Sequence, residues 1–474
     1  MDLDRTDPDE SEVTSRTLSI PNGFRTTAGT TYRPGGHTRP FEVLRRAAVP
    51  PSTPSYLTQS DTVKNAILTR YPAFAYPLYR RYWFASFASV GGTQLVGLAQ
   101  GWLVYKLTGS ALDLGLLGAA AAIPNILMSL FGGVVADRFD KRKIILVTSV
   151  LTAVLLFLLA ALDASGHVRL WHVMMIAALM SLISGVEWPT RQALFPHLIE
   201  RAGLLSAVAL NSVLWQSTRM IMPALGGVLI AATSTAFLFT LAGFGFVVMF
   251  FVMLAIRLAL PGTNGGSTLH QIQQGLDFIT AHELFRWLIL LSYAGMFFVS
   301  AYMQLMPAFA QRLDAGETGY GFLLSATGVG SVVGTLAIGG MQRTRALGLI
   351  LLGGAVLSGV ALYGFALAVQ FGWYGFALLT AFASSVCASI FMIASMTVMQ
   401  LKVPDALRGR VMGIHSITYS LMPLGGLLLG AIANETTLVA ALVFGASAFL
   451  IVTLLVAATR PAIRAIDGNA LTVP

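Results

Sequence analysis

Charge is scarce in this 474-residue sequence, and cysteine is almost absent. Only 11% of the residues are charged, against about 25% in an average soluble chain. A soluble fold would have too few polar side chains to cover its surface, so lipid must be its main solvent. Cys387 is the only cysteine, which excludes an internal disulfide and a cysteine-based metal site. The histidines follow no metal-ligand spacing and no GxxxxGK[ST] motif occurs, so we expect no metal, no cofactor and no use of ATP.

Long apolar runs account for most of the remaining sequence, since 55% of the residues are hydrophobic. The runs between Trp83 and Thr459 can each form a spanning helix of about 20 residues. They do not alternate apolar and polar residues as the strands of a membrane β-barrel would. We therefore predict an all-α integral membrane protein with twelve transmembrane helices. The spans are expected at about 83–106, 113–136, 144–163, 170–189, 204–231, 236–258, 286–309, 319–341, 347–368, 373–400, 411–433 and 438–459.

Composition divides the chain further. The first 81 residues are rich in Pro, Thr, Ser and Arg, which indicates disorder, and they contain neither a signal peptide nor a dense basic block for nucleic acid. The longest internal connection spaces its apolar residues for a short amphipathic helix on the membrane surface. The expected domains are a disordered cytoplasmic tail (1–81), a six-helix bundle (82–258), a cytoplasmic linker with that helix (259–285), a second six-helix bundle (286–459) and a cytoplasmic C-terminal tail (460–474).

The basic residues predict the topology. Of the 19 Lys and Arg residues after residue 81, 15 fall in loops on one side, 3 fall on the other, and Arg219 lies inside a span. Basic loops face the cytoplasm. We therefore expect both termini in the cytoplasm of a cell whose inner membrane holds the protein.

The segment 132–143, GGVVADRFDKRK, ends the second span. It resembles the G-x-x-x-D-R-x-G-R-K loop of the major facilitator superfamily. The resemblance implies an alternating-access transporter of two six-helix bundles, with inverted repeats within each half, in which the acid and arginines of this loop hold the cytoplasmic side shut. Asp140 departs from the usual glycine, and a plain basic loop is the alternative. The expected gating loop consists of Gly133, Asp137, Arg138, Lys141 and Arg142.

Shorter sequence segments indicate which branch of the superfamily the chain resembles. Pro223, Gly226 and Gly227 look like part of the fifth-helix motif of exporters in this superfamily, although close helix packing would also explain the glycines. The sequence MPALGG at 222–227 is echoed by MPLGG at 422–426, which fits two repeated halves with a site between them. The phrases at 105–110, 211–219 and 403–411 resemble the branch that contains bacterial siderophore exporters and drug efflux proteins.

A substrate cavity is predicted from polar stripes in the spans. Arg219 lies near mid-membrane, where a charge costs about 2.5–3.5 kcal/mol, so we expect it to face a watery cavity and an anionic or acceptor-rich substrate. A structural hydrogen-bond hub is the alternative for Arg219, and bundle packing is the alternative for every other member. Helices one, four, seven and ten line the cavity in the superfamily that the chain resembles. The expected cavity residues are Thr93, Gln94, Gln100, Asn211, Trp215, Gln216, Arg219, Tyr293, Phe297, Gln304, Ser389, Met392 and Met396.

Acids are rare within the spans. Glu187 precedes Arg191 by four residues, which favours a salt bridge over a proton relay. Asp113, the second candidate for coupling, is expected at a helix N-terminus. We predict a monomeric secondary transporter that exports amphipathic small molecules such as drugs or siderophores in exchange for protons, and no enzyme activity. Uptake of a small organic solute by the same fold, and a membrane receptor or scaffold without transport, are the alternatives.

Overall fold

A computed structural model of the chain describes residues 71–256, 268–341 and 344–469, with the side chains of 129–138 and 268–272 left out. Within these ranges every regular element is helical. Eleven helices are long and apolar enough to span a membrane. Helix α2 is the twelfth, and its serines, glycines and glutamines make it more polar than the others. The predicted all-α membrane fold is therefore confirmed, whereas most of the predicted N-terminal tail lies outside the described residues.

The first half consists of six long helices, preceded by the short 3-10 turn η1 (Pro72–Ala75). Gly109 ends the first of them in the left-handed conformation at φ 65°, and the Ser110 hydroxyl accepts from the Asp113 N–H at the start of the next. The expected helix-terminal position of Asp113 is thereby confirmed. The helices are α2 (Pro77–Thr108), α3 (Ala111–Arg138), α4 (Lys141–Ala164), α5 (Leu170–Leu194), α6 (Leu204–Ala232) and α7 (Thr235–Ala255).

The second half repeats this pattern with two interruptions. Its first span breaks into a π-helical turn (Gly295–Val299) and a 3-10 segment (Ser300–Leu305) between α9 and α10, and its fifth span breaks at Ile417 between α14 and α15. The helices are α8 (Thr268–Ala281), α9 (Glu283–Ala294), α10 (Met306–Arg312), α11 (Gly316–Met341), α12 (Leu347–Phe371), α13 (Tyr374–Lys402), α14 (Asp405–Ser416), α15 (Thr418–Glu435), α16 (Leu438–Thr459) and α17 (Pro461–Arg464).

Helix α2 begins earlier than the apolar pattern predicts. Pro77 occupies its first turn, where the missing N–H costs nothing. The Tyr79 hydroxyl donates to the Ala207 carbonyl at 3.0 Å, and the Trp83 indole N–H donates to the Leu210 carbonyl at 3.1 Å. Both bonds hold the start of α2 against α6. The last residues assigned to the tail therefore belong to the first helix, because their aromatic side chains pack inside the bundle.

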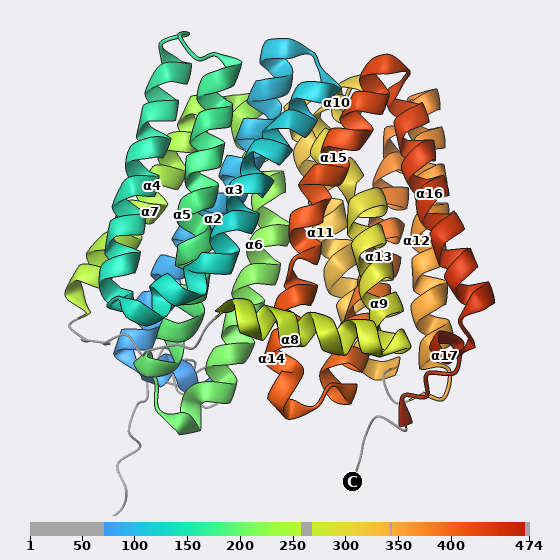
Figure 1. Ribbon diagram of the computed structural model, residues 1–474. Coiled ribbons are helices and arrows are strands. Elements are labelled where there is room, and N and C mark those ends of the chain that lie inside the picture. The colour runs from blue at the N-terminus through green and yellow to red at the C-terminus, as the bar shows by residue number, and fades with distance from the viewer. Residues whose placement is uncertain (1–70, 257–267, 342–343, 470–474) are drawn as a thin grey trace, which may run out of the picture. The chain divides into compact units, whose positions relative to one another are not determined.

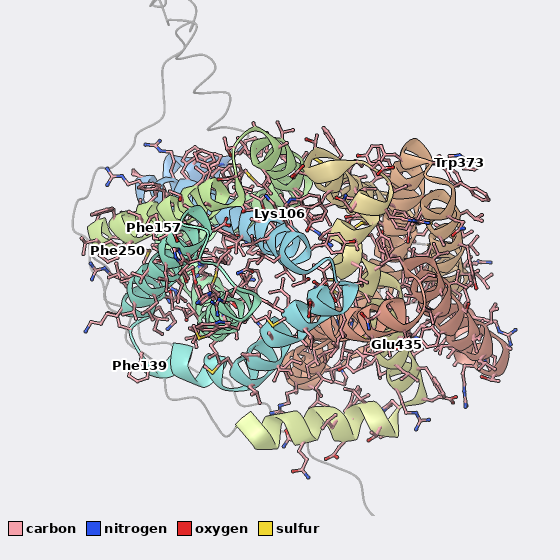
Figure 2. The ribbon with its side chains drawn as sticks, turned by 90° about the horizontal axis from the view of Figure 1, so that it is seen from above. Lys106, Phe139, Phe157, Phe250, Trp373 and Glu435 are labelled. Carbon is pink, nitrogen blue, oxygen red and sulfur yellow. The ribbon has the colours of Figure 1, made fainter. Side chains whose placement is uncertain are left out.

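Small residues bring the helices of each half together, and large apolar side chains face outward. A Cβ on Gly245 of α7 would lie 2.6 Å from the Ala88 carbonyl oxygen of α2, so this contact depends on glycine. Leu151 and Leu455, within α4 and α16, are 48% and 58% exposed, and Phe139 and Trp373, in the connections after α3 and α12, lie at the periphery in Figure 2. Apolar side chains on such an outer surface are stable in lipid, as the composition predicts.

The linker helix α8 packs against α14. Figure 1 shows α8 running crosswise to the spans, in front of the lower part of the molecule. A Cβ on Gly275 would lie 2.8 Å from Cδ1 of Ile414, so the absence of a side chain there allows the contact. Ile279 is buried and Leu276 is exposed. The predicted amphipathic helix is present, and its described buried face contacts protein.

Candidate functional site

The two halves meet through equivalent helices. The second span of each half packs against the fifth span of the other, so α3 contacts α15 and α11 contacts α6 (Figure 1). We call the end of the protein where α2 begins and α3 ends the tail end, and the opposite end the far end. A site between the halves is bounded by these two pairs of helices.

Glycine allows α6 and α11 to touch through their backbones. A Cβ on Gly227 would lie 2.6 Å from the Glu317 carbonyl oxygen, and a Cβ on Gly328 would lie 2.8 Å from the Arg219 carbonyl oxygen. The Ala224 N–H, next to Pro223, donates to the Ser325 hydroxyl of α11 at 2.8 Å. The packing alternative for the exporter-type motif is therefore present in the structure, at the contact between the halves.

The second pair, α3 and α15, repeats this arrangement. A Cβ on Gly115 would lie 2.6 Å from Cα of Leu427, and one on Gly430 would lie 2.5 Å from the Ala111 carbonyl oxygen. Pro423 packs against Gly118, where a Cβ would lie 3.1 Å from the proline ring. The two echoed MP-and-GG phrases thus occupy corresponding places, each at a contact between the halves.

These contacts lie toward the far end. Trp102 of α2 stacks on Tyr320 of α11 there, with ring centroids 5.9 Å apart. Toward the tail end, Leu205 of α6 and Leu336 of α11 are 84% and 73% exposed, and no atom lies within 4 Å of a Cβ built on Gly339. The described halves are therefore in close contact toward the far end, and we infer that the space between them is accessible from the tail end.

Arg219 lies where the closed and accessible regions meet. Its backbone packs on Gly328, yet its side chain is exposed. Its guanidinium interacts electrostatically with the hydroxyl of Tyr419, which is exposed and belongs to the other half. None of the ion pairs in the described part of the chain includes Arg219. This charge is consequently free to meet an acceptor that enters between the halves.

The stripe on α6 includes an aromatic pair. Trp215, one turn before Arg219, is half-buried and contacts Trp188 of α5 edge to face, with ring centroids 4.7 Å apart. Asn211 and Gln216 are also half-buried. Trp188 was not predicted, because it belongs to a span in which no polar stripe is visible.

The stripe on α2 changes character along its length. Thr93 is exposed and donates to its own helix at the Ser89 carbonyl, while Gln94 is half-buried. No atom lies within 4 Å of a Cβ on Gly97. Gln100 is buried, and among the described residues its side-chain N–H group has no partner. The stripe therefore runs from open space near the tail end to an unpaired donor near the closure.

The stripe predicted in the seventh span does not exist as a single helical face. The π-turn and the 3-10 segment change the residues per turn, so positions four apart no longer align. The Tyr293 hydroxyl donates to the Ile414 carbonyl at 2.8 Å, and the Phe297 backbone packs against Gly425. Gln304 lies at the contact between the halves, 3.4 Å from a Cβ on Gly118.

The tenth span contributes mainly to packing within its own half. The Ser389 hydroxyl donates to that of Ser331 on α11 at 3.1 Å. Met392 and Met396 are half-buried. Such flexible apolar side chains can repack around solutes of different shape.

The predicted salt bridge between Glu187 and Arg191 is confirmed. Oε1 of Glu187 accepts from Nη2 and Nε of Arg191 at 2.5 and 2.7 Å, and Nη2 also donates to the Ser89 hydroxyl at 3.1 Å. The two side chains are only 9% and 11% exposed. The pair therefore connects α5 to α2 within the first half.

Only part of the predicted gating loop can be examined. The side chains of Gly133, Asp137 and Arg138 lie outside the described residues. Asp140 caps α4 by accepting from the Arg142 N–H at 2.9 Å, so the departure from glycine has a local role. The Arg142 guanidinium donates to the Met253 and Leu254 carbonyls at 3.0 Å each, at the C-terminus of α7. Lys141 is buried.

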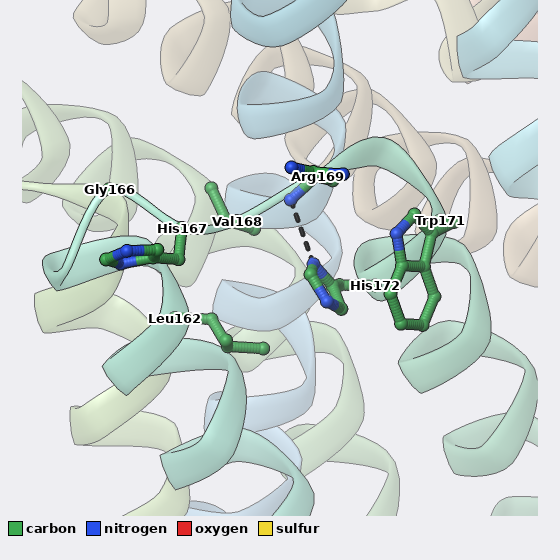
Figure 3. Close-up of a pocket in the computed structure, with 7 residues that line it drawn as sticks. All are labelled: Leu162, Gly166, His167, Val168, Arg169, Trp171 and His172. Atoms are coloured by element: carbon green, nitrogen blue, oxygen red, sulfur yellow. Dashed lines mark hydrogen bonds between the residues drawn. The ribbon is translucent and has the colours of Figure 1, made fainter.

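A separate open cavity of about 410 Å³ lies at the loop between α4 and α5 (Figure 3). Figure 3 shows the His172 ring accepting from the Arg169 N–H, at 3.0 Å. Among the described residues no group of three potential ligands could hold a metal. None of the predicted cavity residues lines this hollow. Its lining residues are Leu162, Gly166, His167, Val168, Arg169, Trp171 and His172.

Known proteins share this architecture. The chain is 23% identical over 363 residues to the staphyloferrin A transporter of Staphylococcus aureus, covering 75% of this chain and 89% of that protein. It is 25% identical over 371 residues to the multidrug efflux pump Tap of Mycolicibacterium fortuitum, with coverage of 75% and 89%. The enterobactin exporter EntS of Escherichia coli is 24% identical over 386 residues, with coverage of 81% and 90%.

Solved structures support the same fold at lower identity. The nucleoside transporter NupG superposes with a TM-score of 0.65 at 13% identity, over 80% of this chain and 98% of that one. A bacterial homologue of the lysosomal transporter Spinster, inward-facing and occupied, gives 0.65 at 13% over 83% and 98%. The model of the family described as Transmembrane secretion effector matches residues 68–472. The chain is therefore a multi-pass membrane protein of the transmembrane secretion effector family, within the major facilitator superfamily, and it resembles the branch that contains siderophore exporters and drug efflux proteins.

Proposed function

We propose that this protein is a secondary active exporter of amphipathic small molecules that exchanges them for protons by alternating access. The observation that carries the proposal is the exposed side chain of Arg219, which has no ion-pair partner among the described residues, at the contact between the halves. A charge kept at mid-membrane without a protein counterion costs free energy, which an incoming acceptor group would recover.

The substrate class follows from the donors that the proposed cavity offers. Tyr419 of the other half interacts with Arg219, and the unpaired side-chain N–H group of Gln100 lies on α2 nearer the far-end closure. Indole rings and methionines supply apolar surface nearby. Relatives are named for siderophores and for several drugs. Drugs or siderophores that combine apolar surface with hydrogen-bond acceptors fit these groups.

The basic loops assign the orientation. If 15 of the 19 basic residues after residue 81 face the cytoplasm, the tail end is cytoplasmic and both termini are inside the cell. The described state, accessible from the tail end, is then the one that takes up substrate from the cytoplasm. We place the protein in the inner membrane as a monomer, since the two halves of one chain enclose the site.

Opening the far end requires α6 to separate from α11 and α3 from α15. The gating loop would stabilise the opposite closure, because a carboxylate near facing basic groups gains energy only when the tail end is shut. Asp137 and Arg138 would make these contacts, while Arg142 and Asp140 fix the loop to α7 and α4. Glu187 serves a salt bridge in the described state, and a proton relay through it is the alternative for coupling.

The test is efflux from cells that lack or overproduce the protein, against a panel of siderophores, antibiotics and dyes, with and without an uncoupler. Export predicts lower accumulation on overproduction and loss of this effect with the uncoupler. Accumulation above the control would show uptake instead. No change for any compound, together with a need for residues 1–75, would favour a receptor or scaffold.

The gating loop has its own test. Asp137→Asn should abolish transport while leaving membrane insertion intact, because the closed tail end loses its stabilising charge. Glu435→Gln, at an exposed acid at the end of α15, is the matched control and should retain transport. Wild-type flux in the Asp137→Asn protein would rule out the gate assignment.

A further inference from the structure

Two tryptophans from different helices form an exposed aromatic surface beside the unpaired arginine. We infer that the pair Trp188 and Trp215, which we call the indole platform, stacks on a planar ring of the substrate while Arg219 binds an anionic group on it. The proposed substrate class is therefore an aromatic anion. This inference rests on the proposed transport site and specifies that its substrate carries an aromatic ring and a negative charge.

The placement of the helices shows which space the platform faces. Helix α5 packs against α3 and α4, and α6 packs against α2 and α11, so α5 and α6 share no extended contact. Their tryptophans still meet with ring centroids 4.7 Å apart. The rings therefore bridge the gap between α5 and α6. Trp188 is 45% exposed, and we infer that the free part of its ring faces the space between the halves.

The distance to the charge follows from helix geometry. Trp215 and Arg219 are four residues apart on α6, an uninterrupted helix over this stretch, so their side chains leave the same face about 6 Å apart. The Arg219 side chain is long and flexible, so its guanidinium can reach an anionic group on a ring that lies against Trp215 one turn away. A ring on the platform would thus bring its anionic group to the guanidinium.

Charge selects an anion over a cation. Indole faces attract cations in general, but a cation here would be repelled by the guanidinium of Arg219, which has no ion-pair partner among the described residues. The neighbouring carboxylate of Glu187 offers no compensation, because Arg191 holds it at 2.5 Å. The same salt bridge fixes the turn of α5 that carries Trp188, since Arg191 also bonds to Ser89 of α2.

Three ligands of similar size separate the contribution of the aromatic ring to binding from that of the negative charge. They are 1-naphthoate, its neutral amide 1-naphthamide, and the saturated acid decahydronaphthalene-1-carboxylate. Binding of each radiolabelled compound to purified protein in nanodiscs is measured by equilibrium dialysis, counting only what excess unlabelled 1-naphthoate displaces. Because the assay measures binding alone, its outcome does not depend on whether the protein pumps.

The tryptophan variants test the ring. Trp188→Leu should weaken 1-naphthoate about 2- to 13-fold, the effect of one aromatic contact, and leave the saturated acid unchanged. Trp188→Phe should retain most of the affinity. Trp171→Leu removes an exposed tryptophan from the start of the same helix and should change nothing. Trp215→Leu, on the other helix, repeats the test if the Trp188→Leu protein does not fold.

The arginine variant tests the charge. Arg219→Gln should weaken both acids about tenfold or more and leave 1-naphthamide unchanged. The inference is overturned if wild-type protein does not bind 1-naphthoate, if the saturated acid binds as tightly, or if Trp171→Leu has the effect of Trp188→Leu. Ring-dependent binding without efflux would refute export and support the indole platform. Efflux with ring-independent binding would support export and refute the indole platform.

Discussion

Removing the charge of Glu187 should destabilise the first half of the protein. In the wild type, Oε1 of this carboxylate accepts from two nitrogens of Arg191, and both side chains are about nine-tenths buried. Glu187→Gln leaves an acceptor of the same shape, so the loss is the counterion of a buried guanidinium whose other partners are the hydroxyls of Ser89 and Tyr82. Breaking a buried pair in this way costs about 3–5 kcal/mol, and the remaining acceptors place our expectation at about 3.

A double-mutant cycle measures this value without relying on one variant. Arg191→Gln alone should cost a similar amount, because it leaves a buried carboxylate without a donor. The double variant has no unpaired charge and should be less destabilised than the sum of the two by well over 1 kcal/mol. Unfolding in increasing SDS, followed by the helical circular dichroism signal, gives the three free energies.

The same variants decide between the two roles of Glu187. A structural salt bridge predicts that the double variant recovers uncoupler-sensitive efflux along with stability. A proton relay predicts that both Glu187→Gln and the double variant lose it, however stable they are. Additivity of the single variants within about 0.5 kcal/mol would refute the reasoning from the geometry, since it would mean that the two side chains do not interact.

Further predictions concern the contact between the halves and the loop of the tail end. Gly227→Ala places a methyl group 2.6 Å from a backbone oxygen and should shift the protein away from the state that is closed at the far end. The accessibility of a cysteine introduced near Trp102 would report this shift. Gly353→Ala is the neutral control, because no atom lies within 4 Å of the added methyl group. Arg142→Ala removes two bonds to the end of α7, so we expect a loss of about 1–3 kcal/mol of unfolding free energy in SDS titration, and unchanged stability would contradict the capping role.

The architecture could be predicted because span length and loop charge are local properties of the sequence. The apolar runs locate the spans to within a few residues, although aromatic side chains such as Tyr79 extend α2 beyond its apolar core. Periodicity failed in the seventh span, where it assumed 3.6 residues per turn across Gly295–Leu305. The local sequence pattern does not predict that Gly425 of α15 and Gly445 of α16 pack against the backbone of this segment, at Phe297 and Phe298.

The candidate site was predicted in part. Arg219 stands out because a lone charge in an apolar run is conspicuous in any sequence. Trp188 does not, because a tryptophan among apolar residues is ordinary, and its partner Trp215 lies on a helix that α5 hardly contacts. Ser389 resembled a cavity residue, and its bond to Ser331 depends on which face of α13 meets α11. The apolar period of one segment predicts a helix, but it does not predict which other helix that segment will contact.

The closure of the far end by backbone contacts has a kinetic consequence. Where α6 meets α11 and α3 meets α15, glycines place main chain against main chain, so no rotation of a single side chain can create a passage there. A passage there must wait for whole helices to move apart, which occurs in microseconds to milliseconds, not in the picoseconds to nanoseconds of rotamer changes. Its width is set by the displacement of the halves and not by the conformation of any one side chain.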